Sequence, residues 1–236
     1  MDSARKQLDV DEKALAPIEG AHASPRIMGA GAASPHAVPH ATPRPGPAEP
    51  APAPFSLAGF AGRFAEISAD PSGAPLTLAM RLVLEAQRKK EPVAWIGRHA
   101  SPFYPPDAAD AGIDLRALPV IWVPTPLLAA RAADLLVRSG GFGLVVVDLG
   151  VDARLPIPAQ TRLAGLAREH DTALVFLTEK HETHPSIGSL VSLRTHAVRT
   201  GHEASAYRCE VRALKDKRRG PGWRYAEVFR GPDGLH

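Results

Sequence analysis

The chain has 236 residues, a net charge of +3 and 44% hydrophobic residues, which is enough for one sizeable domain and an appendage. Its single cysteine, Cys209, excludes an internal disulfide framework and a cysteine-rich zinc site. No apolar run approaches the roughly 20 residues of a membrane span. Residues 1–6 are not followed by the apolar core of a signal peptide. We therefore expect a cytoplasmic protein.

The first 54 residues differ in composition from the remainder. Residues 1–28 have a limited apolar periodicity that is compatible with a short helix over 5–20. Residues 29–54 contain eight prolines among Ala, Gly, Ser and His. Proline blocks both helices and central strands, so we expect a Pro/Ala-rich linker that is extended or disordered. The core domain is then predicted to cover 55–236.

From residue 62 onward, short apolar runs alternate with segments of helical periodicity. Strands are predicted at 64–67, 93–96, 120–123, 144–148 and 173–178. Helices are predicted over 75–90 and 107–111, from Pro126 to just before Gly140, and over 158–170. This alternation predicts an α/β fold with a mostly parallel sheet and helices on both faces. Three further strands, at 193–198, 206–214 and 223–230, are predicted to be antiparallel at the C-terminal end.

The same patterns predict which side chains enter the core. Trp95 and Trp122 lie in apolar strands, so we expect both to be core residues. The helix that begins at Pro126 is predicted to direct a stripe of apolar residues inward: Leu127, Leu128, Ala132, Leu135 and Leu136.

The loop after the first strand stands where a nucleotide-binding P-loop would hold phosphate. That motif, G-x-x-x-x-G-K-[ST], uses its lysine for the β- and γ-phosphates and its hydroxyl for magnesium. Here Ser72 and Gly73 precede Ala74, which has no charge, and Pro75, which has neither a hydroxyl nor a backbone N–H. A hydrogen bond to a charged group contributes about 1.5–3 kcal/mol, so losing the lysine alone weakens binding about tenfold or more. We expect no ATP cofactor, no metal and no catalytic residue here; an ordinary strand–turn–helix is the alternative.

Several strings, in the same order, resemble RecA-family recombinases. Residues 62–67 resemble the strand that leads into the RecA P-loop, and residues 145–148 resemble its Walker B strand. Residues 174–177 resemble the strand before the second DNA-binding loop, and residues 209–217 resemble a late strand with paired lysines. The resemblance covers about 60–236 and implies a RecA-like core.

The departures from that family are specific. The family's catalytic glutamate would follow the second strand, where Gly97, Arg98 and His99 provide no carboxylate. Asp148 matches the Walker B aspartate, but the chain lacks the P-loop that would bring it nucleotide-bound magnesium. The long DNA-binding loop is reduced to residues 183–186. A RecA-like core with an erased P-loop is similar to the ImuA family, also described as SulA/RecA-like proteins.

The resemblance to ImuA implies a non-catalytic adaptor in SOS-induced, error-prone translesion synthesis on nucleoid DNA. The implied partners are ImuB, a Y-family-polymerase-like protein, and, indirectly, an error-prone replicative polymerase subunit. RecA itself is a further implied partner, contacts with DNA are expected to be weak, and no membrane is involved. A RecA subunit receives its neighbour's N-terminal segment on its core, and a degenerate copy can keep that docking surface. A divergent ATPase with a rebuilt site and a SulA-like division inhibitor remain open as alternatives.

A basic region near the C-terminus is the candidate for nucleic-acid or partner binding. Residues 208–230 contain eight Arg or Lys and three Asp or Glu, a net charge of +5. Trp223 and Tyr225 alternate with cations and would stack on bases. A solvated hairpin loop and a subunit interface are the alternatives. The candidate residues are Arg212, Lys215, Lys217, Arg218, Arg219, Trp223 and Arg224.

Overall fold

The computed structural model describes residues 53–99, 101–151, 153–203 and 206–230. All of them belong to the compact unit Glu49–His236. The predicted N-terminal helix and nearly all of the predicted linker lie outside the described residues. Among the described helices, none has the length and apolar character that a membrane crossing requires.

Helices and strands alternate along the chain as far as residue 179, as predicted, and most of their ends lie within a few residues of the predicted ones. The strand predicted at 193–198 extends to Glu203, and the short helix Leu57–Phe60 was not predicted. The helices are α1 (Leu57–Phe60), α2 (Pro75–Arg88), α3 (Pro105–Asp110), α4 (Pro126–Arg138) and α5 (Ile157–Glu169), with one 3-10 turn, η1 (Leu115–Ala117). The strands are β1 (Arg63–Ala69), β2 (Val93–Arg98), β3 (Val120–Val123), β4 (Leu144–Val151), β5 (Ala173–Glu179), β6 (Leu193–Glu203), β7 (Ala206–Asp216) and β8 (Arg224–Arg230).

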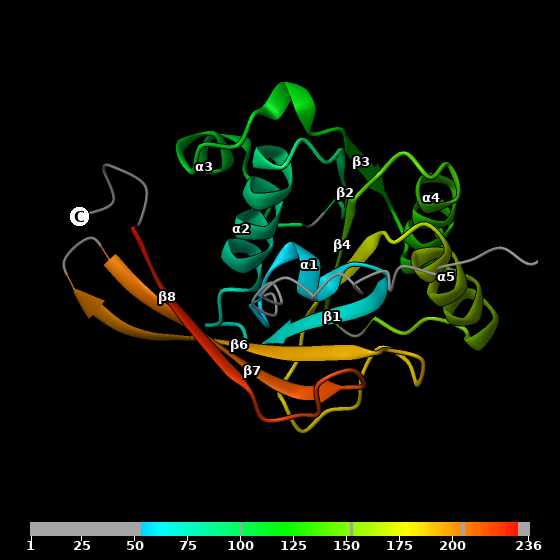
Figure 1. The fold of residues 1–236 in the computed structure, drawn as a ribbon. Coiled ribbons are helices and arrows are strands. Elements are labelled where there is room, and N and C mark those ends of the chain that lie inside the picture. The colour runs from blue at the N-terminus through cyan, green and yellow to red at the C-terminus, as the bar shows by residue number, and fades with distance from the viewer. Residues whose placement is uncertain (1–52, 100, 152, 204–205, 231–236) are drawn as a thin grey trace, which may run out of the picture. The chain divides into compact units, whose positions relative to one another are not determined.

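The strands form one sheet in the order β3-β2-β4-β5-β1-β6-β7-β8 (Figure 1). Neighbours from β3 to β6 in this order are parallel, whereas β6–β7 and β7–β8 are antiparallel. Strand β6 therefore joins the two parts, since it is parallel to β1 on one side and antiparallel to β7 on the other. The predicted fold class, mostly parallel with antiparallel C-terminal strands, is confirmed.

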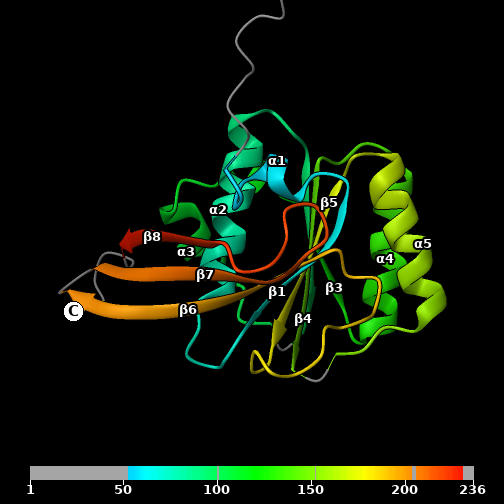
Figure 2. The same ribbon diagram turned by 60° about the horizontal axis from the view of Figure 1, so that its bottom comes forward.

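Helices cover both faces of the parallel part of the sheet (Figure 2). Helices α1 and α2 pack on one face, where alternate residues of β1 such as Ala65 and Ile67 enter the core. Helices α4 and α5 pack on the other face, against Phe64 of β1 and Phe176 of β5. The central strands read as continuous apolar runs because both of their faces are covered.

Of the predictions about the core, Trp95 is fully buried as predicted, the prediction for Trp122 was wrong and that for the inner face of α4 was only partly right. Trp122 is 42% exposed, because β3 is the edge strand of the sheet and has a neighbouring described strand on one side only. Helix α4 packs Ala132 and Leu136 partly against the core, as predicted, but not its other three leucines. It packs on the sheet through smaller residues, which allow a close approach: Ala129, Ala130, Ala133 and Val137. Its exposed leucines are Leu127, Leu128 and Leu135.

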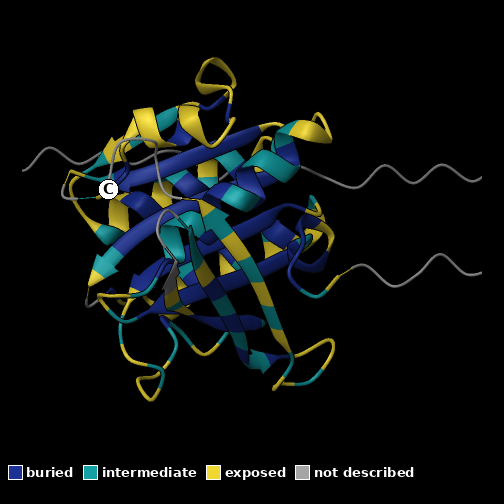
Figure 3. Cartoon of the chain, turned by 90° about the vertical axis from the view of Figure 1, so that its left-hand side faces the viewer, coloured by how far each residue is buried: buried dark blue, intermediate teal, exposed yellow. Residues whose placement is uncertain are grey.

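The C-terminal strands extend beyond the parallel part of the sheet. Pairing of β1 with β6 ends at Ala69 and Ala197, but β6 continues to Glu203 and pairs with β7 along that length. A register shift between Thr200 and His202 interrupts this extension. In β8, exposed residues alternate with half-buried ones, as expected for a strand with one solvated face (Figure 3).

Candidate functional site

The loop between β1 and α2 is a tight turn that differs from a P-loop in length. Only residues 70–72 separate Ala69, the last residue of β1, from Gly73, whereas the P-loop motif has four residues between its glycines. The Gly73 N–H donates to the Asp70 carbonyl at 2.8 Å. A Cβ on Gly73 would lie 2.5 Å from the Ala69 Cβ and 2.8 Å from the Ala197 carbonyl oxygen. This glycine is therefore required by packing against β1 and β6.

The start of helix α2 has the residues that the sequence predicts and no phosphate-binding chemistry. Ala74 occupies the N-cap position without a side-chain hydrogen bond, and Pro75 is the first helical residue. Neither supplies a cation or a hydroxyl, and proline removes one backbone N–H. The residues present at this loop do not fit a magnesium–triphosphate group.

Asp148, the residue in the Walker B position, is bound by other residues of the chain. Its carboxylate accepts hydrogen bonds from the Ser101 hydroxyl and the Gly150 N–H, and the charged Arg98 lies close to it. Burial raises the pKa of the Asp148 carboxyl, and these three neighbours only partly offset that effect. Arg98 and Ser101 come from the segment where the RecA-like pattern would place a catalytic glutamate. A protein cation and a hydroxyl thus occupy the surroundings of this carboxylate.

Sequence reasoning missed a buried charged residue in the middle of β1. Glu66 is fully buried and accepts hydrogen bonds from the Thr178 hydroxyl at 2.7 Å and the Ile187 N–H at 3.0 Å. The Lys180 Nζ lies 2.5 Å from its Oε1, and the Arg194 Nε lies 4.0 Å from its Oε2. The signal was a lone glutamate within an apolar strand, which needs a buried partner.

The segment between β5 and β6, where the RecA-like pattern places a DNA-binding loop, is fixed to the sheet by cations. Lys180 donates to the Pro185 carbonyl at 2.8 Å, and Arg194 donates to the carbonyls of His181 and His184. In addition, Arg212 pairs with Glu182 and Lys215 donates to the Ser189 carbonyl at 3.2 Å. Two of the predicted nucleic-acid candidates, Arg212 and Lys215, therefore hold this segment.

The remaining basic candidates divide between a turn and one face of the sheet. Lys217, Arg218 and Arg219 are exposed in the turn that follows β7, where Arg218 also donates to the Ala61 carbonyl at 2.9 Å. Arg224 lies opposite Arg212 in the β7–β8 register and is exposed.

The predicted alternation of aromatic and basic residues separates them onto opposite faces of β8. Tyr225 faces the core, where its ring stacks on Phe55 at 5.2 Å between centroids, and Arg224 faces solvent. Trp223 also packs against the core, and its indole N–H donates to the Asp216 Oδ2 at 2.9 Å. The structure thus does not bring these rings and Arg224 to one surface.

An apolar groove of about 380 Å³ lies between α4 and α5. Its apolar lining comes from Leu127, Ala130, Leu135, Ala159 and Leu163. Arg131 and Arg162 also line the groove, and Arg138 is linked to it through Asp134, another lining residue. Arg138 and Arg162 both pair with Asp134, whereas Arg131 makes no hydrogen bond or ion pair with another described residue. Leu127 and Leu135, two of the leucines that the helical pattern wrongly placed in the core, thus line a surface groove.

Comparison with known proteins relates the chain to RecA, although no family model matches it. RecA of Corynebacterium jeikeium (strain K411) is 30% identical over 190 residues, which cover 69% of this chain and 49% of that protein. RecA of Thermus aquaticus is 26% identical over 207 residues, which cover 71% of this chain and 60% of that protein. RecA of Leifsonia xyli subsp. xyli (strain CTCB07) is 30% identical over 141 residues, which cover 51% and 39%.

These relatives establish distant homology to RecA and agree with the observed fold. The chain spans about half the length of the curated relatives it matches.

Proposed function

We propose that this distant homologue of RecA is a non-catalytic adaptor in SOS-induced, error-prone translesion synthesis, which acts by binding a Y-family-polymerase-like partner such as ImuB. The observation that carries the proposal is the absence of nucleotide-binding chemistry at one end of the parallel strands in a distant homologue of RecA. The loop before α2 is too short and has Ala74 and Pro75 in place of the lysine and hydroxyl, and Asp148 is bound within the chain. An intact scaffold without this chemistry supports a role in docking.

The groove between α4 and α5 supplies the docking surface of this proposal, and the free edge of β3 offers a second surface. Strand β3 has no neighbour on its outer side among the described strands, so its backbone groups on that side are available to a further strand. Ile121 and Val123 of β3 pack into the same core layer as α4. An extended segment of the partner would pair with β3, and a separate part of the partner would place an apolar side chain in the groove. Carboxylates that flank this side chain would face Arg131 and Arg162.

The test measures binding of the full chain to the purified polymerase-like partner. Leu135, which is 65% exposed in the groove, is changed to Asp, and Val228, which is 64% exposed on β8, is changed to Asp as a matched control. We expect Leu135→Asp to weaken binding at least about tenfold, because a carboxylate in an apolar pocket is costly. We expect Val228→Asp to bind like the unchanged protein. The proposal is refuted if the partner does not bind, or if both variants bind equally well.

The effect of ATP on partner binding, and the choice of partner, separate this function from the alternatives. An adaptor without a nucleotide site binds its partner equally with and without ATP. ATP turnover that Asp148→Asn abolishes would instead identify a divergent ATPase. Binding to the tubulin-like division protein, without binding to the polymerase-like partner, would identify a SulA-like inhibitor. RecA is tested in parallel, since it is a further partner implied by the proposal.

A further inference from the structure

Strands β6, β7 and β8 share a face that lies open to solvent. On their other face, Cys209, Val211 and Tyr225 pack into or against the core that includes α2, so the residues between them point away from it. Helices α4 and α5 lie on this open side of the sheet but over its parallel part, away from β7 and β8 (Figure 2). The open surface, here called the β8 face, consists of Val198, Arg208, Glu210, Arg212, Arg224, Ala226, Val228 and Arg230.

An aliphatic patch flanked by arginines lies along β8 on this face. Ala226 and Val228 are successive residues of the face, and Val228 is 64% exposed. Arg224 precedes the patch and Arg230 follows it, about 20 Å apart along the strand. Neither arginine makes a hydrogen bond or ion pair with another described residue.

The rest of the β8 face leaves this positive charge unneutralised. Glu210 pairs with Arg208 at 3.3 Å and so does not serve Arg224. Arg224 lies directly opposite Arg212 in the β7–β8 register, and like charges in such a pair destabilise a sheet. Arg212 has a partner in Glu182, whereas Arg224 has none among the described residues. A carboxylate from another molecule would therefore be favoured beside Arg224.

We propose that the β8 face docks an acidic amphipathic helix of a second protein partner. Helices already cover the parallel part of this side of the sheet, and a further helix would extend that layer over the antiparallel strands (Figure 2). Carboxylates about 14 residues apart on a helix span the distance between Arg224 and Arg230. Aliphatic side chains between these carboxylates would cover Ala226 and Val228. The β8 face shares no residue with the groove between α4 and α5, so this docking is additional to the proposed function.

The same residues disfavour nucleic acid and a second copy of the chain on this face. The rings of Trp223 and Tyr225, which would stack on bases, pack against the core instead. Glu210 lies in the middle of the face and would repel a phosphate backbone. A two-fold copy would bring Arg224 and Arg230 against the same two arginines. An acidic protein surface is the chemistry that remains.

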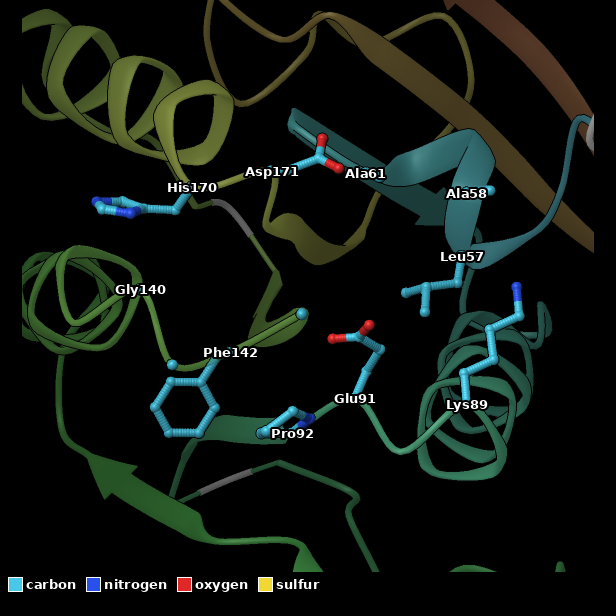
Figure 4. Close-up of a pocket in the computed structure, with 12 residues that line it drawn as sticks. Leu57, Ala58, Ala61, Lys89, Glu91, Pro92, Gly140, Phe142, His170 and Asp171 are labelled. Carbon is cyan, nitrogen blue, oxygen red and sulfur yellow. The ribbon is translucent and has the colours of Figure 1, made fainter.

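A cavity of about 470 Å³, where the segments before β2, β4 and β5 meet, does not suit such a partner. Glu91 and Asp171 line it, and Figure 4 shows the Glu91 carboxylate pointing into the cavity. The Lys89 ammonium, which also lines it, is bound to Glu85 at 2.8 Å. An acidic helix would be repelled there.

The test measures binding of the full chain to a labelled, stapled helical peptide by fluorescence anisotropy. The peptide has leucines at helical spacing and a pair of glutamates near each end, about 14 residues apart. We expect saturable one-to-one binding, weakened about tenfold or more by Val228→Asp, which sets a carboxylate against the leucines. Arg224→Gln should weaken binding about threefold, as for an exposed ion pair. Arg168→Gln, which removes an exposed arginine of α5, is the matched control and should leave affinity unchanged.

Further arms identify the occupant and the surface. A peptide with lysines in place of the glutamates should not bind, and binding equal to that of the glutamate peptide overturns the proposal. The absence of saturable binding of the glutamate peptide also overturns it, as does binding of oligothymidylate in its place. Loss of peptide binding in Leu135→Asp but not in Val228→Asp would assign the peptide to the groove and refute docking at the β8 face. Binding of the polymerase-like partner is measured separately, so failure of either proposal is distinguishable from failure of the other.

Discussion

The change Asp216→Asn tests whether the C-terminal strands are fastened to the core by one buried carboxylate. Asp216 Oδ1 lies 2.6 Å from the Arg63 Nη2, and both side chains are nearly fully buried. The same carboxylate accepts hydrogen bonds from the N–H groups of Arg218 and Arg219 and from the Trp223 indole. Because Arg63 begins β1 and Asp216 ends β7, this cluster joins the parallel and antiparallel parts of the sheet.

Two estimates give the loss in free energy of unfolding that we expect from Asp216→Asn. Burial alone would raise the pKa of Asp216, but the hydrogen bonds from Arg63, Trp223 and the two amides outweigh it and lower the pKa to about 2. Relative to an unfolded value near 4, this shift corresponds to about 2.5 kcal/mol of stability at neutral pH. Removing one partner of a buried pair costs about 3–5 kcal/mol, because the other charge stays buried. We expect Asp216→Asn to lower the free energy of unfolding by about 3 kcal/mol.

The contribution of Asp216 to stability should fall as the pH is lowered. The folded pKa of Asp216 is depressed, so its contribution is fully present above the unfolded pKa near 4 and is lost as pH falls toward 2. The measurement is urea unfolding followed by tryptophan fluorescence at pH 7 and pH 3, with Asp110→Asn as the surface control. The difference between the unchanged protein and Asp216→Asn should shrink by about 1 kcal/mol at pH 3. A difference below about 1 kcal/mol at pH 7, or one that does not change with pH, would refute the reasoning.

Three other predictions concern the loop and the strand that leads to it. Glu66→Gln should lower the free energy of unfolding by about 3–5 kcal/mol in urea titrations, because Lys180 stays charged in a largely buried site. Gly73→Ala should cost about 1–3 kcal/mol in the same assay, since its Cβ would meet β1 and β6 below contact distance. The double variant Ala74→Lys with Pro75→Thr restores both P-loop side chains. It should still not bind a fluorescent ATP analogue, because the loop stays one residue short. Measurable binding of the analogue would contradict this account.

Sequence patterns predicted the backbone of this fold well, because each signal was local. The proline at the start of α2, the Thr125 cap of α4 and the continuous apolar strands each fix an element by themselves. The Thr125 hydroxyl accepts from the Leu128 N–H, as the Thr-Pro pattern predicted. The residues of the altered P-loop were also predicted together, since they are consecutive along the chain.

The features that the sequence did not predict depend on contacts between residues far apart in the chain. Glu66 finds its partners at Thr178, Lys180 and Ile187, more than a hundred residues away, so no local pattern revealed that cluster. The inner face of α4 was predicted only in part, because alanine and leucine both count as apolar in a helical pattern and packing distance decides between them. The aromatic and basic residues of β8 alternate in sequence, and a strand necessarily sends alternate residues to opposite faces.

The borders of the sheet differ in how they would behave in concentrated solution. The border at β8 carries exposed arginines, and a register shift near Thr200 interrupts the free part of β6. Both features discourage the addition of a further strand. The border at β3 is the tetrapeptide Val120–Val123, which has no charge and exposes an indole ring. A further strand should therefore add most readily at these four residues, and co-expression with a protein that covers them should raise the yield of soluble material.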